Sequence, residues 1–502
     1  MSRRSLLAIP IAVFAIALAV LLLHGSGDSR LPLPRAQAVR AALNDPAVHK
    51  QLAAHGWNRV RVGSLDSRLA RVTFFDGARI RAVAAVDAQA QVEHTRVYPP
   101  GAPMYGSSLS DAPWLLALLA LGFVLATATR PLLSLRNLDV VALLGLTVPI
   151  LAGDHQLFKL SVLSGYVPLA YLCWRLLQRA RWSHVPVRQP LVALESRRLL
   201  IYVIGAAALL AIVAMSAAGA IDVGFASTAG ATLLLHGTLP YGHMPTDVLH
   251  GDTYPLLNYV LYIPAAAVAP VRDAFDDTTS AVFVAFAAAL VVAVALRRAG
   301  PRTMLAWLCF PPLAVAVASG TNDLLLAAAV AVGLAAAARG GRSALALTAG
   351  AWIKLAPLAL LPIWLARSGG RPLARALVAV AGLSAALTGW ILVLGGPAGI
   401  GHMLQALSFQ LSRGTLQSAW SLLGLGPGQQ VAQAATIALV AWGALNARRI
   451  GKDPARLAAL SGAVLAALQL SASNWSYLYV VWLFPCAALA LLADRAPVAT
   501  TR

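Results

Sequence analysis

The sequence predicts an all-α polytopic membrane protein with a small extracytoplasmic α+β domain near its N-terminus. Of its 502 residues, 59% are hydrophobic and only 12% are charged, and the mean hydropathy is +0.73. Soluble domains carry about 25% charged residues. Apolar runs of about 20 residues, each long enough to cross the hydrocarbon as a helix, recur along most of the chain. Arginine clusters separate these runs, as cytoplasmic loops do.

The net charge of +20 is better explained by membrane orientation than by nucleic acid, because the arginines gather in short clusters between apolar runs. No nucleic-acid partner is therefore expected. The three cysteines, Cys173, Cys309 and Cys486, lie inside apolar segments without paired spacing. This pattern supports neither a disulfide framework nor a zinc site.

The N-terminal stretch MSRRSLLAIPIAVFAIALAVLLL has a basic start and an apolar centre. Such a stretch fits either a membrane anchor or a cleaved secretory signal. No small-x-small cleavage site follows closely, which favours an uncleaved transmembrane anchor over residues 1–24.

Residues 25–111 are polar and mixed in charge, and they predict a small α+β domain outside the membrane. AVRAALNDPAVHKQLAAHG indicates a helix. RVRVGSLDSRLARVTFF and ARIRAVAAVDAQAQVEHTRVY alternate as strands do, with a turn at Asp76–Gly77. This order of a helix followed by strands loosely resembles a PepSY-type module.

The rest of the chain predicts about twelve membrane crossings plus one broken hairpin. Residues 112–197 are expected to hold additional transmembrane helices and a basic cytoplasmic loop, residues 198–493 the core, and residues 494–502 a cytoplasmic tail. The expected helices cover 112–129, 138–153, 157–177, 198–219, 303–318, 324–338, 374–394, 429–446, 457–472 and 475–493, with one more from DDTTS to LRRAG.

The ambiguous stretch is SALALTAGAWIKLAPLALLPIWLARSGGR, because one straight span would put its last arginines outside. A broken hairpin that turns near Lys354 and Pro357 and returns to the cytoplasm satisfies the charge rule better.

This topology places a set of polar residues on the outer face of the membrane. The set comprises Asp222, His250, Asp252, Asn322, Asp323, His402, Arg413 and Asn474. Incidental polar residues would not gather on one side in this way, so we expect a functional site there.

Asp222 stands where an apolar helix reaches the outer interface, which is consistent either with a solvated helix end or with a positioned functional group. The following loop carries HGDTYPLLNYVLYIPAAAVAP, which is too short and too rich in proline for a confident span. We expect a helix on or dipping into the outer leaflet, with Asn258, Tyr259 and Tyr262 on its surface. An aromatic belt accounts for the tyrosines. It does not account for His250 and Asp252.

Asn322 and Asp323 occupy a tight outer turn, where Thr321 or Asn322 is also a plausible helix cap. Lys354 lies within an apolar segment, where a lysine costs about 2.5–3.5 kcal/mol on insertion scales. It either extends to the interface or acts as a cation that receives a phosphate.

The expected loop 395–428 supplies His402 and Arg413 on the non-cytoplasmic side, against the usual charge bias. A lipid phosphate that pairs with the guanidinium would account for Arg413. No P-loop, Rossmann fingerprint, Gly-x-Ser-x-Gly or His-Glu-x-x-His motif occurs in a credible context.

The order of these motifs resembles glycosyltransferase family 87. The resemblance covers residues 198–493 and rests on Asp222, G-x-x-PYG, HGDTYPLLNY, GTNDLLLAAAVAVGLAAAARGG and AGAWIKLAPLALLPIW. That family includes the mycobacterial polyprenol-phosphate-mannose-dependent α-1,2-mannosyltransferases. The resemblance implies a C-type membrane transferase fold that uses a lipid-phosphate sugar on the outer face of a bacterial cell membrane.

The resemblance also implies residue roles. Asp222 corresponds to the family's base, and the sugar- and phosphate-facing groups map onto His250, Asp252, Asn322, Asp323, Lys354, His402 and Arg413. Tyr254 is expected to orient the sugar or acceptor together with His250 and Asp252. A polyprenyl phosphate is a good leaving group, so one base and one or two cations suffice for an inverting transfer, with no cofactor and no required metal. The expected partners are membrane lipid, the lipid-linked sugar donor, and a glycolipid, glycan or protein acceptor.

Two other functions remain open from the sequence. Broken helices such as the hairpin at Lys354 also suit a lipid or sugar transporter or flippase. A third possibility is a non-catalytic sensor or assembly factor in which residues 25–111 carry the function and the helices form a scaffold.

Overall fold

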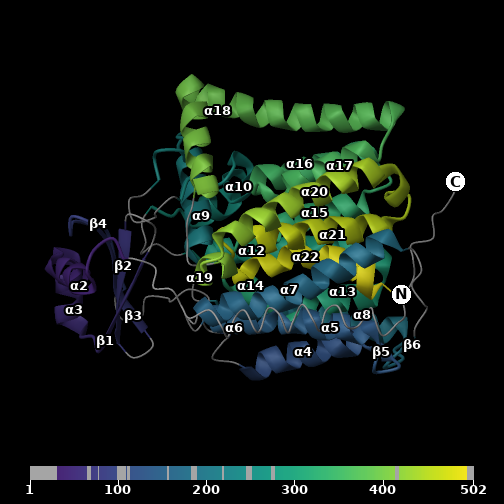
Figure 1. The fold of residues 1–502 in the computed structure, drawn as a ribbon, viewed down its shortest axis with the longest axis horizontal. Coiled ribbons are helices and arrows are strands. Elements are labelled where there is room, and N and C mark those ends of the chain that lie inside the picture. Colours follow the sequence, from purple (N-terminus) through teal and green to yellow (C-terminus); the bar gives the residue numbers. More distant parts are fainter. Residues whose placement is uncertain are drawn as a thin grey trace.

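Figure 1 shows the computed structural model of the chain, a helical bundle with a small sheet domain at one end. The structure describes residues 31–64, 69–76, 79–98, 109, 113–154, 158–182, 189–217, 220–244, 251–272, 278–412 and 418–493. The expected anchor over residues 1–24 and the expected tail over residues 494–502 lie outside the described residues.

The small domain is a four-stranded antiparallel meander covered by two helices. The strands are β1 (Arg59–Ser64), β2 (Leu69–Asp76), β3 (Arg79–Asp87) and β4 (Val92–Val97), in the order β1-β2-β3-β4. The expected single helix is two, α2 (Arg35–Asn44) and α3 (Pro46–His55). Pro46 starts a new helix, and the Asp45 side chain caps it by accepting from the backbone N–H groups of Ala47 and Val48.

The core of this domain forms between the two helices and one face of the sheet. Ala38 and Ala42 of α2 and Val48 and Leu52 of α3 pack against the apolar positions of the strands. Val72 and Phe74 of β2 face this core and are fully buried, but Thr73 and Phe75 on the other face of the strand are buried as well, so burial along β2 does not alternate.

The remainder of the described chain is almost entirely helical. The helices are α4 (Pro113–Thr127), α5 (Leu135–Gly145), α6 (Thr147–Asp154), α7 (Phe158–Arg181), α8 (Ser196–Met215), α9 (Asp222–Leu235), α10 (Leu256–Leu261), α11 (Ile263–Val268), α12 (Thr279–Leu296), α13 (Pro301–Leu308), α14 (Pro311–Ala318), α15 (Asp323–Ala335), α16 (Gly340–Ile353), α17 (Leu361–Ala366), α18 (Gly370–Ser412), α19 (Ala419–Leu422), α20 (Gly426–Ile450), α21 (Pro454–Ser471) and α22 (Val480–Ala487). Short helical turns are η2 (Arg297–Ala299), η3 (Ala356–Ala359), η4 (Tyr477–Tyr479) and η5 (Ala488–Leu492), and β5 (Thr129–Arg130) pairs with β6 (Gln189–Pro190).

The long apolar helices identify a helical membrane protein. The expected count of about twelve crossings is wrong, because several of the helices are too short to cross a membrane. Among the described residues, six helices are long and apolar enough to cross a membrane, or seven if the bent pair α13–α14 forms one span. Five further apolar helices have only 10–17 residues. At 1.5 Å per residue, a 15-residue helix reaches about 22 Å, short of a hydrocarbon core of about 30 Å. Hydropathy alone overestimates the number of membrane crossings, because the sequence stays apolar through the breaks between helices.

Proline and glycine mark those breaks. α13 and α14 meet at an angle of 54° just before Pro311 and Pro312. α18 is bent at Gly396, whose φ of 58° is left-handed, and Pro397 follows it. Figure 1 shows α18 running along the top of the bundle and then turning down. The expected loop 395–428 is therefore helical as far as Ser412, as the second limb of α18.

The broken hairpin predicted around Lys354 is present. α16 ends at Ile353, Lys354 is extended with φ −145° and ψ 145°, and η3 and α17 follow. Arg367, just after α17, donates to the carbonyl of Ala337, just before α16. The end of α17 therefore lies beside the start of α16, and the chain reverses direction at Lys354.

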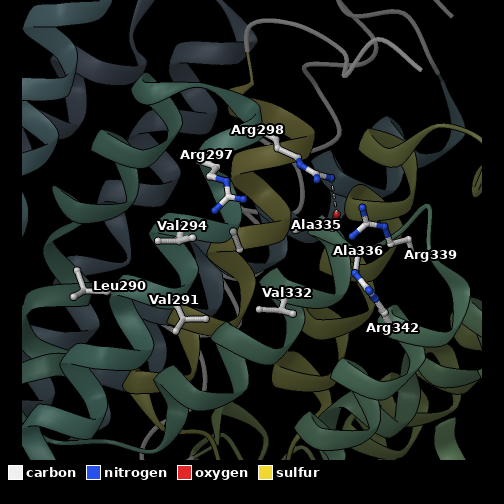
Figure 2. A pocket seen from close by; sticks show the side chains of 11 residues that line it. Leu290, Val291, Val294, Arg297, Arg298, Val332, Ala335, Ala336, Arg339 and Arg342 are labelled. Atoms are coloured by element: carbon white, nitrogen blue, oxygen red, sulfur yellow. Dashed lines mark hydrogen bonds between the residues drawn. The ribbon is translucent and has the colours of Figure 1, made fainter. Parts of the chain in front are cut away.

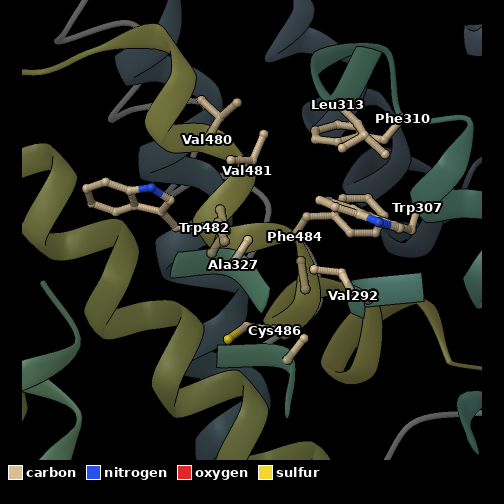
Figure 3. Packing of buried hydrophobic residues seen from close by; sticks show 14 of the residues in the cluster. Val292, Trp307, Phe310, Leu313, Ala327, Val480, Val481, Trp482, Phe484 and Cys486 are labelled. Carbon is tan, nitrogen blue, oxygen red and sulfur yellow. The ribbon is translucent and has the colours of Figure 1, made fainter. Parts of the chain in front are cut away.

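An aromatic cluster fixes α22 inside the bundle. The rings of Phe310 and Phe484 lie 4.6 Å apart between centroids, and Trp307 packs 5.2 Å from Phe484. The indole N–H of Trp307 donates to the carbonyl of Ala289 at 2.8 Å. Figure 3 shows Trp482 of the same helix pointing away from this cluster. The packing on one side of α22 thus holds Trp482 toward α15.

Candidate functional site

Asp323 and Lys354 form a buried ion pair. Asp323 begins α15 and is 1% exposed, and Lys354 in the hairpin break is 8% exposed. The Lys354 Nζ donates to Oδ1 of Asp323. The indole N–H of Trp482 donates to the same oxygen at 2.8 Å, and the Thr321 hydroxyl donates to Oδ2 at 2.6 Å. Since a buried carboxylate is costly without a counter-charge and donors, the four side chains form one unit.

Local backbone geometry produces this arrangement. Gly320, with φ of 60°, turns the chain from α14 into α15, and a Cβ on it would lie 2.7 Å from that of Ala220. Lys354 leaves the end of α16 in an extended conformation because α16 stops ahead of Pro357. Its side chain therefore crosses to α15 instead of continuing along its own helix.

Three aromatic rings surround the ammonium of Lys354. Its Nζ lies 4.9 Å from the ring centre of Tyr479, 5.4 Å from that of Trp482 and 5.7 Å from that of Tyr254. Tyr479 and Trp482 stack with 4.2 Å between centroids. Tyr479 and Trp482 are not among the site residues predicted from the sequence. Tyr479 lies 125 positions after Lys354 in the chain, so no local sequence pattern connected them.

A buried chain of polar side chains extends from the same turn. Asn322 Nδ2 donates to Asn258 Oδ1 at 2.8 Å, Asn258 Nδ2 donates to the Ser227 hydroxyl at 2.9 Å, and Ser227 donates to the carbonyl of Val223. Asn322, Asn258 and Ser227 are fully buried. Within the described residues, Asn322 Oδ1 accepts no hydrogen bond. The network links α15, α10 and α9 and leaves one buried acceptor unused.

The expected exposure of the polar and aromatic residues of α10 is wrong. Asn258, Tyr259 and Tyr262 are fully buried rather than exposed on its surface. The Tyr259 hydroxyl donates to the carbonyl of Gly251 at 2.8 Å, and its ring fills the space that Gly230 of α9 leaves, since a Cβ there would lie 2.3 Å away. Prolines keep α10 and α11 short, so these helices fold into the bundle. The aromatic-belt interpretation therefore fails for Tyr259 and Tyr262.

Asp222 is the exposed carboxylate beside this buried cluster. It is the first residue of α9, and its Oδ1 accepts from the backbone N–H of Val223 at 2.8 Å. The backbone N–H of Ile221 donates to the carbonyl of Ser319 at 2.8 Å. A Cβ on Gly224 would lie only 2.5 Å from the Gly320 carbonyl oxygen. The start of α9 thus packs directly against the turn that carries Asn322 and Asp323.

A second group of predicted residues lies around Gly242. Its N–H donates to Asp252 Oδ2 at 3.1 Å, and a Cβ on Gly242 would lie 3.8 Å from Nδ1 of His402 on α18. The Tyr241 hydroxyl donates to the carbonyl of Tyr254 at 3.1 Å. Burial, and secondarily Asp252, raises the pKa of Tyr241 above its usual range, so this phenol remains a donor. Tyr254 links this group to the Asp323–Lys354 ion pair, because its ring also faces the Lys354 ammonium.

The structure therefore gathers most of the predicted site residues at one end of the bundle. Seven are described: Asp222, Asp252, Tyr254, Asn322, Asp323, Lys354 and His402. His250 and Arg413 lie outside the described residues. Within the described part of the chain, no group of three or more His, Cys, Asp or Glu side chains is arranged to hold a metal ion.

Comparison of the chain with protein-family models, curated proteins and solved structures finds no match.

Proposed function

We propose that the protein is an integral membrane glycosyltransferase that moves a hexose, such as mannose, from a polyprenyl-phosphate donor to an acceptor hydroxyl. The observation that supports this most is the pairing of an exposed carboxylate, Asp222, with an adjacent buried polar cluster. A transferase of this kind needs one hydrated base and a fixed wall of hydrogen-bonding groups, and this end of the bundle supplies both.

In the proposed reaction, Asp222 takes the proton of the acceptor hydroxyl. The acceptor oxygen attacks the anomeric carbon as the bond to the phosphate oxygen breaks, and polyprenyl phosphate leaves. In-line attack inverts the anomeric centre. Asp252, Tyr254, His250 and His402 are assigned to orienting the sugar or acceptor.

Charge on the leaving phosphate requires a nearby cation. Lys354 already shares its ammonium with Asp323, so a donor phosphate would bind that ammonium jointly with Asp323. Arg413 is the second proposed phosphate ligand.

The proposed orientation places this site on the extracytoplasmic side. Arginines collect at the opposite ends of the helices, for example Arg298 after α12 and Arg456 in α21. They donate to carbonyls at helix ends, Arg298 to Ala335 and Arg456 to Ala180. Positive residues favour the cytoplasmic side, so the Asp222 end faces out.

Substitution of the proposed base tests the function. Asp222→Asn is expected to lower transfer of radiolabelled mannose from polyprenyl-phosphate-mannose in isolated membranes by about 10²- to 10⁴-fold. Glu195→Gln is the matched control, because Glu195 is an exposed carboxylate next to a helix start at the opposite end, with no side-chain capping bond. Near-normal turnover by the Asp222→Asn protein contradicts the assignment.

A transporter is the second candidate, because Lys354 and Asp323 form a buried ion pair at a helix break, as substrate sites of transporters do. Cysteines placed at positions 222 and 252 distinguish the two functions. A transferase predicts labelling from the outside only, whereas a transporter predicts reactivity that alternates between the two sides.

A further inference from the structure

Four arginines meet at the end of the bundle opposite to Asp323. Arg297 and Arg298 follow α12, and Arg339 and Arg342 stand at the start of α16. With side chains of α12 and α15 they line a cavity of about 480 Å³. Figure 2 shows the four guanidinium groups gathered around one part of this cavity.

The four cavity arginines make fewer side-chain hydrogen bonds than Arg136 and Arg456 at the same end of the bundle. Arg136 donates to the carbonyl of Leu492 at 2.5 Å, and Arg456 donates to that of Ala180 at 2.8 Å. In the cavity only Arg298 makes such a contact, to Ala335 at 3.3 Å. Among the described residues, none of the four cavity arginines forms an ion pair with a carboxylate. The cavity therefore presents a concentrated positive charge.

The rest of the cavity wall is aliphatic. Val291 and Val294 of α12 and Val332 of α15 line it and are exposed. Figure 2 shows Val291 and Val332 below the arginines and Val294 next to Arg297. From Leu290 to Arg298, the wall extends about 12 Å along α12, close to the depth of one hydrocarbon leaflet of about 15 Å.

We propose that this groove binds an anionic phospholipid from the leaflet on the arginine side. The headgroup phosphate accepts hydrogen bonds from Arg297, Arg339 and Arg342, and an acyl chain covers Val291, Val294 and Val332. Guanidinium groups bind phosphate oxygens through charge-assisted, bidentate bonds. A small inorganic anion would leave the aliphatic wall uncovered, so a lipid satisfies both parts of the groove. This inference is independent of the proposed transferase chemistry, which lies at the other end of the helices.

The test uses the full chain in nanodiscs of phosphatidylcholine doped with spin-labelled phosphatidylglycerol. The wild-type chain is expected to immobilise labelled phosphatidylglycerol in preference to labelled phosphatidylcholine. Arg339→Gln/Arg342→Gln is expected to weaken that preference about tenfold or more. The control Arg197→Gln/Arg198→Gln removes two exposed arginines from the start of α8 and is expected to stay within about twofold of wild type. If the double arginine variant and its control lose the lipid preference equally, or if neither loses it, the proposed site is wrong.

A second variant separates lipid from free anion and does not depend on the arginines. Val332→Trp fills the apolar wall while keeping the charge, and it is expected to abolish the lipid preference. Glycerol phosphate added in solution is expected to compete weakly. If glycerol phosphate displaces the labelled lipid fully, or if Val332→Trp leaves the preference intact, the groove is not an acyl-chain site. Circular dichroism confirms that each variant keeps its helical content.

Discussion

Two aspartates begin neighbouring helices at the same end of the bundle, yet their environments are opposite. Asp323 is 1% exposed and bonded to Lys354, Trp482 and Thr321. Asp222 is exposed, and its only bond from the described residues comes from its neighbour Val223. The helix N-terminus favours a carboxylate at both positions. The two aspartates therefore differ in their burial and not in their position at a helix N-terminus.

This difference separates a group that organises the site from one that is available for chemistry. Asp323 is held by three donors, so giving it a proton would disrupt the cluster. Asp222 keeps an oxygen, Oδ2, that accepts no bond from the described residues, and water or a substrate hydroxyl reaches it. Under the proposed function, Asp222 is the residue that transfers the proton and Asp323 is a positioning residue.

Lys354→Met is expected to have the largest effect on stability. It leaves the Asp323 carboxylate buried without a counter-charge, which costs about 3–5 kcal/mol. Unfolding of the purified protein in detergent micelles, followed by circular dichroism, measures the loss. Asp323→Asn/Lys354→Met removes both charges and is expected to recover much of it. If Lys354→Met is as stable as the wild type, Asp323 is not held by this ion pair.

Trp482→Phe is expected to cost about 1.5–3 kcal/mol, because it removes the N–H donor from a charged, buried acceptor. The phenyl ring still stacks on Tyr479, so the effect reports mainly the hydrogen bond. Trp182→Phe, at an indole that is 57% exposed, is the control and is expected to be nearly neutral. Equal stability of the two variants would show that Asp323 does not depend on the indole.

Gly224→Ala tests the contact that holds the two aspartates side by side. The new methyl group would meet the Gly320 carbonyl at 2.5 Å, so one backbone must move, at about 1–3 kcal/mol. Gly205→Ala in α8 is the matched control, since nothing lies within 4 Å of its Cβ position, and alanine is expected to stabilise that helix slightly. We also expect Gly224→Ala to reduce transfer activity. Unchanged stability and activity would mean that this close approach is unimportant.

Local signals in the sequence predicted the polar end of the bundle well. Asp222, Asn322, Asp323 and Lys354 stand out because charged and amide groups are rare in apolar segments, and the break at Lys354 follows from Pro357 and the arginines beyond it. The small domain was equally predictable, because apolar and polar residues alternate along the sequence of its strands. These features depend only on near neighbours in the chain.

Contacts between distant segments were not predictable in the same way. Trp482 bonds to Asp323 across 159 positions, and Asn258 bonds to Asn322 across 64. Tryptophan and asparagine are equally common in an interfacial belt or on a solvated helix. The sequence therefore does not show that these side chains are buried, which depends on how the helices pack. The predicted number of crossings was wrong for a related reason, because hydropathy does not register the bend between α13 and α14 or the short length of other apolar helices.

Asp222→Asn is expected to change stability least, by no more than about 0.5 kcal/mol. The asparagine oxygen still accepts the bond from Val223, and the side chain remains in water, so no buried partner is lost. The same detergent unfolding measurement applies. Full stability with lost transfer supports the separation of roles between the two aspartates. A loss as large as that of Lys354→Met would instead make Asp222 part of the framework, and Asp252 would then be the next candidate base.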